Sequence, residues 1–196
     1  MSSYRASRRN SALATDDALR AVSVLTDIAA AHSVRYALAG GVAMHLYGFT
    51  RATKNVDFIA SNGLPVPVVR VLSFGGFAYD VAVPGLAESV RVDWIVRNDD
   101  LAEVYALALD EAEETEEGFP IVSAEWLCIL KMLAGRGKDE MDLRFLLRQP
   151  DLVRRSDVIA ILRRLYGKAA HHSIESFKAE CLYADVMRQK DDAGEV

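Results

Sequence analysis

Hydrophobic residues along this chain follow two different periods, and the alternation between them predicts an α+β protein. From Thr15 apolar residues recur every three or four positions, with two acids in the first turn, as expected for a helix with one buried face. Short apolar segments bounded by turn residues indicate strands at residues 36–39, 56–60, 77–83, 89–96 and 119–122. We therefore expect a small mixed sheet flanked by helices.

Helical spacing also appears between and after these strands. A short helix is predicted after Gly41, another over residues 67–77 that ends at a glycine pair, and a third over residues 100–108. Residues 111–117 are compatible with a helix end, a strand or a loop. Beyond Ser123, which we expect to cap a helix, the periodicity stays helical to about residue 189, with glycine and proline breaks.

These patterns suggest three regions. Residues 1–13 are polar and basic and are expected to form a mobile tail. Residues 14–122 hold all the predicted strands and form the expected α/β core. Residues 123–196 are a helical extension that we expect to pack on that core. With 196 residues, 51% of them hydrophobic, the chain is long enough to bury a substantial core.

Composition excludes several classes of protein. The formal net charge of -5 argues against a surface that binds nucleic acid indiscriminately, so a polyanion would need a local basic patch. Two cysteines, Cys128 and Cys181, suggest reduced thiols rather than a disulfide framework or a cysteine zinc site. The sequence shows neither a membrane span nor a secretory signal, so we expect a cytoplasmic protein with no membrane partner.

Candidate chemistry is concentrated around a glycine pair and two acidic strands. Gly40 and Gly41 follow the first strand and open a helix, where backbone amides can approach a phosphate. Asp57 and Asp93 each stand among apolar neighbours on a strand, and two such carboxylates can hold Mg²⁺ against phosphate oxygens. The alternative is that these residues have no role in binding, since glycine pairs often mark turns and an Asp on a strand often faces solvent.

The order of these residues resembles the signature of the DNA polymerase β-like nucleotidyltransferase superfamily. Gly40 and Gly41 match its glycine pair, Asp57 its second carboxylate and Asp93 its third, while Asn55 stands where the first carboxylate belongs. Residues 123–147 are similar to the lysine-bearing helix and the Lys-Asp-x-x-Asp segment of small bacterial AbiEii-type and MenT-type nucleotidyltransferases. The positions that match this second segment are Lys131, Lys138, Asp139 and Asp142. The resemblance spans about residues 34–147 and implies the nucleotidyltransferase fold.

The resemblance also implies an activity: Mg²⁺- or Mn²⁺-dependent transfer of a nucleoside monophosphate from an NTP to a hydroxyl of RNA, tRNA or protein. Asp57 and Asp93, with Asn55, would then hold the metal, and Gly40 and Gly41 would cradle phosphates. Arg51 and Lys131 would meet the polyphosphate; their alternatives are an exposed loop arginine and a lysine whose ammonium reaches water. A role in a toxin–antitoxin pair, with an antitoxin protein as partner, belongs to the same expectation.

Asn55 keeps a second class of function open. An amide can offer a neutral oxygen to Mg²⁺, but it lacks the charge of a carboxylate. The second hypothesis is therefore a nucleotidyltransferase-fold protein with impaired catalysis that binds nucleotide, RNA or a partner protein. A regulatory subunit with no nucleotide affinity is the third.

Basic residues gather late in the chain, against its acidic background. They form a candidate surface for RNA or an acidic partner, and a solvated helix face is the alternative. The residues are Arg154, Arg155, Arg163, Arg164 and Lys168. His171 and His172 lack the i, i+4 spacing of a helical metal pair and are not interpreted as ligands.

Overall fold

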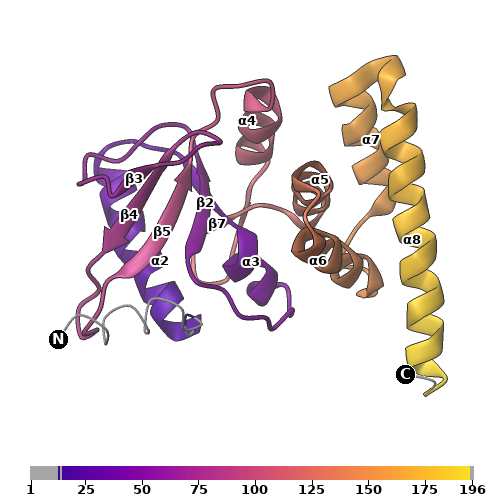
Figure 1. Ribbon diagram of the computed structural model, residues 1–196, viewed down its shortest axis with the longest axis horizontal. Helices are drawn as coiled ribbons and strands as arrows, with labels where there is room; N and C mark the ends of the chain where they lie inside the picture. The colour runs from indigo at the N-terminus through magenta and orange to yellow at the C-terminus, as the bar shows by residue number, and fades with distance from the viewer. Residues whose placement is uncertain (1–12, 14, 195–196) are drawn as a thin grey trace. The chain divides into compact units, whose positions relative to one another are not determined.

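The computed structural model describes residues 13 and 15–194 (Figure 1). The chain divides into two compact units, one ending at Val122 and one beginning at Ser123. We call them the sheet unit and the helical unit. The predicted mobile tail, residues 1–13, lies outside the described residues except for Leu13, whose amide donates to the Thr53 carbonyl at 2.7 Å.

The sheet unit is built on a seven-stranded mixed sheet in the order β3-β4-β5-β2-β1-β7-β6. Strands β2 and β5 are parallel at its centre, β1 pairs antiparallel with β2, and β4 forms an antiparallel hairpin with β5. The strands are β1 (Tyr36–Ala39), β2 (Val56–Ala60), β3 (Arg70–Val71), β4 (Phe77–Val81), β5 (Val90–Ile95), β6 (Glu113–Glu114) and β7 (Pro120–Ile121).

The described residues of this unit also form the helices α2 (Thr15–Ala31), α3 (Gly40–Leu46) and α4 (Ala102–Asp110). The first buries Val22 and Leu25 of its apolar side together with three alanines, and it contacts β2, β4 and β5. The centre of the core is aromatic: the rings of Tyr36, Phe58 and Trp94 lie 5.1 to 5.7 Å apart in edge and tilted arrangements. All three side chains come from the central strands, so the core fixes those strands relative to one another.

One predicted element is wrong. Residues 67–77 do not form a helix: Arg70–Val71 is strand β3, and a turn leads into β4. The backbone amide of Val69 donates to Ala78 at 2.9 Å and that of Leu72 to Gly76 at 3.0 Å. Valine is stiff at χ1 and favours extended backbone, and the adjacent strand supplied the hydrogen bonds that settled its conformation.

The helical unit contains α5 (Ala124–Ala134), α6 (Gly137–Arg148), α7 (Arg155–Tyr166), the short 3₁₀ helix η1 (Gly167–Ala170) and α8 (His171–Asp192). Ser123 caps α5 as predicted, since its hydroxyl accepts a hydrogen bond from the Trp126 amide at 3.4 Å. Gly135 ends α5 in the left-handed conformation that glycine adopts at little cost. Within the unit, α6 contacts both α5 and α8.

The α+β class, with a mixed sheet flanked by helices and a helical C-terminal region, is thus confirmed. Residues 111–117, left open by the sequence, supply the short edge strand β6. In the described part of the chain, no helix combines the length and the apolar character needed to cross a bilayer. Cys128 and Cys181 are both buried free thiols.

Candidate active site

The two candidate carboxylates lie side by side at the centre of the sheet. In the parallel pairing of β2 with β5, Asp57 is the direct register partner of Asp93. Both acids are half-buried, whereas their neighbours Val56 and Val92 are completely buried. Because side chains alternate along a strand, the two acids share one face of the sheet and the valines face the core. Residues 36 positions apart along the chain therefore meet.

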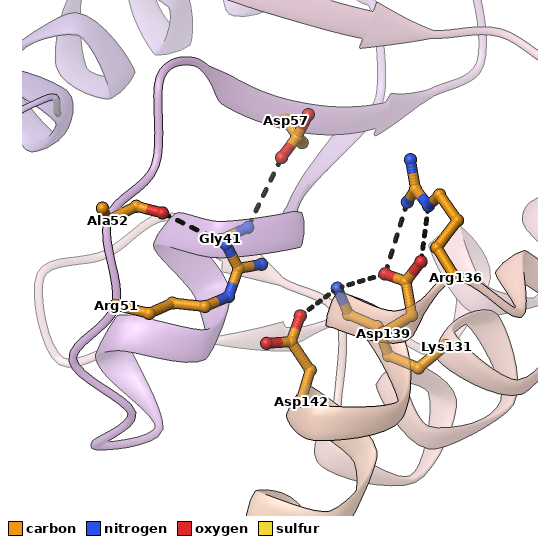
Figure 2. Close-up of polar contacts among 8 residues, drawn as sticks. All are labelled: Gly41, Arg51, Ala52, Asp57, Lys131, Arg136, Asp139 and Asp142. Carbon is orange, nitrogen blue, oxygen red and sulfur yellow. Dashed lines mark hydrogen bonds and ion pairs between the residues drawn. The ribbon is translucent and has the colours of Figure 1, made fainter. Parts of the chain in front are cut away.

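The glycine pair lies against the same carboxylates. Gly40 follows Ala39, which pairs with Asp57 across β1 and β2, and it adopts a φ of +60°. A Cβ placed on Gly40 would lie 1.9 Å from Oδ2 of Asp57, so only glycine fits. The amide of Gly41 donates to that same Oδ2 at 3.4 Å (Figure 2). The turn thus brings backbone into contact with Asp57.

Asn55 links the two acids. Its side-chain nitrogen Nδ2 donates to Oδ1 of Asp57 at 3.1 Å and to Oδ2 of Asp93 at 2.6 Å. A single amide group therefore contacts both carboxylates, at the position where the resemblance would place the first carboxylate. This contact is the feature of the site that the sequence did not reveal.

The segment before β2 supports this arrangement. The hydroxyl of Thr53 donates to the backbone carbonyl of Asn55 at 3.0 Å, and a Cβ on Gly41 would lie 2.7 Å from that hydroxyl. The Arg51 guanidinium donates to the Ala52 carbonyl at 3.4 Å (Figure 2). Arg51 thus lies in the loop between the glycine turn and β2, where the sequence placed it.

The donor atoms suit a hard divalent cation. Asp57 and Asp93 present carboxylate oxygens, and rotation of the Asn55 amide about χ2 would present a third oxygen, which is the ligand type that Mg²⁺ prefers. Among residues 13 and 15–194, no three His, Cys, Asp or Glu side chains gather as a metal-binding group. Two acids with an amide therefore fit Mg²⁺ or Mn²⁺, with less charge than three acids would give.

Lys131 belongs to a buried ion cluster in the helical unit. Its ammonium Nζ lies 3.1 Å from Oδ1 of Asp139 and 2.5 Å from Oδ2 of Asp142, and both acids are completely buried (Figure 2). The side chain of Lys131 is 7% exposed, so the alternative of an ammonium that reaches water is wrong. Asp139 and Asp142 lie on one face of α6, as their spacing predicted.

Arg136 completes the cluster with hydrogen bonds to Asp139 at 2.5 and 3.3 Å. Burial acts to raise the pKa of the Asp139 carboxyl, but hydrogen bonds from Arg136 and Lys131 outweigh it and hold that pKa below its ordinary value. Asp139 is therefore a carboxylate at neutral pH. Its role in joining α5 to α6 is visible, and a phosphate-binding role for Lys131 stays a prediction.

The basic residues of the helical unit differ in their surroundings. Arg154 contacts Glu125 at 3.3 Å and Arg155 contacts Asp185 at 2.6 Å, so both take part in ion pairs within the unit. The guanidinium of Arg164 lies 5.7 Å from the centre of the Trp126 ring. Arg163 and Lys168 are exposed. Arg154 and Arg164 are exposed as well, and Arg155 is half-buried.

Similarity to known proteins appears at the level of structure. No protein-family model matches the chain, and no curated protein matches it. The chain is similar to the crystal structure of an antigenic nucleotidyltransferase-like protein from Paracoccidioides brasiliensis, with 18% sequence identity, 91% of each chain covered and a TM-score of 0.47.

Proposed function

We propose that this chain is a divalent-metal-dependent nucleotidyltransferase that moves a nucleoside monophosphate from an NTP to a hydroxyl acceptor. The observation that carries the proposal is the register pairing of Asp57 with Asp93, beside a glycine turn whose amide faces Asp57. Acids brought together against closely approaching backbone are suited to hold a metal and a polyphosphate. The motif resemblance of residues 34–147 supplies the reaction class.

In this proposal Asp57 and Asp93 would hold Mg²⁺ or Mn²⁺, and the amide oxygen of Asn55 would be a neutral ligand beside them. The bound cation would supply charge neutralisation for the polyphosphate. Gly40 has no Cβ, and the Asp57 carboxyl fills the place where a Cβ would stand, so this acid lies directly against the backbone of the glycine turn. Arg51 sits in the adjoining loop and would contribute a guanidinium to the same anion.

The acceptor in this proposal is the end of an RNA, with tRNA as the first candidate, because the resemblance includes MenT-type enzymes. Arg163 and Lys168 are exposed cations on the helical unit and are suited to contact an RNA backbone. An antitoxin partner remains part of the proposal through the same resemblance.

The test is incubation of the purified chain with each labelled NTP, Mg²⁺ and total tRNA. The Asp57→Asn change keeps the shape of the side chain and removes its charge, so we expect labelling of RNA to fall by at least about 100-fold. Asp100→Asn is the matched control, since Asp100 is an exposed acid of the sheet unit, and it should label RNA normally. Equal labelling by wild type and Asp57→Asn would remove Asp57 from the reaction.

A second function is favoured by the two hydrogen bonds that the Asn55 side chain donates to Asp57 and Asp93. They hold the two acids together without a cation, which suits a protein that binds nucleotide without turning it over. In that case NTPs would raise the melting temperature while no label reaches RNA or protein. Turnover of any NTP would exclude this alternative.

A further inference from the structure

The amide of Asn55 stands between two carboxylates and donates to both. The distances from Nδ2 are 3.1 Å to Oδ1 of Asp57 and 2.6 Å to Oδ2 of Asp93. A primary amide nitrogen carries two hydrogens, so one hydrogen can serve each acid. The backbone carbonyl of Asn55 in turn accepts from Thr53 at 3.0 Å, which steadies the residue from which the amide extends.

The nitrogen of this amide favours the site without a cation, and its oxygen favours the site with a cation bound. With nitrogen toward the acids, two charge-assisted hydrogen bonds offset the repulsion between Asp57 and Asp93. With oxygen toward the acids, three oxygens face one another, and only a cation among them makes that arrangement favourable. A cation placed between the acids would therefore compete with the nitrogen for Oδ1 of Asp57 and Oδ2 of Asp93.

We propose that Asn55 is a built-in competitor of the catalytic cation: its amide holds Asp57 and Asp93 together in the metal-free protein, and the cation binds by displacing it. This inference rests on the proposed function, because it assumes that the acidic pair is the cation site. A third acid at this position would act in the opposite way, since it would repel the pair until a metal arrived. Asn55 thus sets the cation affinity of this chain and keeps it low.

The proposal is tested by whether one substitution strengthens or weakens Mn²⁺ binding. Asn55→Ala removes both the competing nitrogen and the oxygen ligand. If competition dominates, Mn²⁺ should bind Asn55→Ala more tightly than wild type by about tenfold, the factor that matches the net worth of one hydrogen bond. Titration with Mn²⁺, with the free ion measured by electron paramagnetic resonance, gives the Mn²⁺ dissociation constants of wild type and Asn55→Ala. Asn98→Ala, which changes an exposed asparagine of the same unit, should bind Mn²⁺ as wild type does.

Weaker Mn²⁺ binding by Asn55→Ala would overturn the proposal, because it would make Asn55 a net ligand of the metal. Equal binding by the two proteins would overturn it as well. Absence of Mn²⁺ binding in wild type, Asn55→Ala and Asn55→Asp alike would remove the cation site, and with it both this inference and the proposed function. Tighter binding by Asn55→Ala without any NTP turnover would support the competition and reject only the proposed function.

Two further measurements test whether the Asn55 amide holds the acids together without metal and leaves them when a cation binds. In EDTA both Asn55→Ala and Asn55→Asp should melt below wild type, because neither can donate to the two acids. In ¹⁵N-labelled wild type, the side-chain amide signals of Asn55 should move as Mg²⁺ is added, since the nitrogen leaves its carboxylate partners. Unchanged melting in EDTA, or unmoved signals at saturating Mg²⁺, would contradict the displacement.

Discussion

At the scale of single residues, the site depends on a position where a side chain is forbidden. Gly40 has a φ of +60°, which costs other residues about 1–2 kcal/mol, and the space where its Cβ would stand is filled by the Asp57 carboxyl. Glycine at this position permits the turn and the close approach at once. Asp57 is held beside backbone for that reason.

Gly40→Ala should therefore lower the free energy of unfolding by more than about 2 kcal/mol, because backbone strain and a clash with Asp57 act together. Urea unfolding measures the change. Gly137→Ala is the matched control: no atom lies within 4 Å of a Cβ there, and the residue begins a helix, so stability should be unchanged or slightly raised. Equal stability of Gly40→Ala and wild type would show that the turn relaxes easily.

At the scale of elements, charge rather than apolar contact alone joins α5 to α6. Lys131 extends from α5, and its ammonium lies between Asp139 and Asp142 of α6, all three with little or no solvent exposure. Burying ions is costly, but removing one member of such a cluster costs more, since its partners stay buried without their counter-charge. The cluster therefore ties α5 to α6 at these three side chains.

Lys131→Met should destabilise the chain by about 3–5 kcal/mol, because two buried carboxylates lose their ammonium. Lys138→Met, at an exposed position nearby, should change stability by less than about 0.5 kcal/mol. Thermal and urea unfolding compare the variants. Adding Asp139→Asn and Asp142→Asn to Lys131→Met should recover part of the loss. If that triple variant is stable but binds NTP more weakly than wild type, the predicted phosphate role of Lys131 gains support.

At the scale of the whole molecule, hydrogen bonds from basic side chains lower the pKa of carboxyls in both units. These carboxyls include Asp139, Glu175 and Asp185 in the helical unit and Asp99 in the sheet unit. Each has a folded-state pKa below its unfolded value, so its contribution to stability is present above the unfolded pKa and is lost as the pH falls through the folded pKa.

We expect the helical unit to lose its structure at a higher pH than the sheet unit, because Asp139 and Asp185 pair with basic side chains of neighbouring helices there, whereas Asp99 is exposed. The loss should set in below about pH 4, near the unfolded carboxyl pKa values. Each unit has one tryptophan, Trp94 in the sheet unit and Trp126 in the helical unit. Fluorescence of Trp94→Phe and Trp126→Phe, followed from pH 7 to pH 2, reports the units separately. Asp185→Asn should reduce the difference between the pH values at which the two units lose their structure. Loss of the sheet unit first would contradict this prediction.

Local patterns were sufficient for most elements. Helical spacing after Thr15, capping by Ser123 and the apolar segments of the central strands depend on neighbours in sequence, and the structure confirms them. The helix predicted over residues 67–77 is wrong because its conformation is decided by hydrogen bonds to β4, which no local pattern contains. Edge segments of this kind are settled by their partner strand.

For the site, the sequence by itself determined which residues carry charge: acids on two strands, glycines at a turn, an asparagine before β2. Only the tertiary structure decided which of them meet. The parallel register of β2 and β5 sets Asp57 against Asp93, and the pleat gives them a common face on which Asn55 reaches both. Residue identity fixes which interactions a side chain can make, but pairing of distant segments fixes its partners, because a register shift of one residue would turn every side chain of a strand to the opposite face.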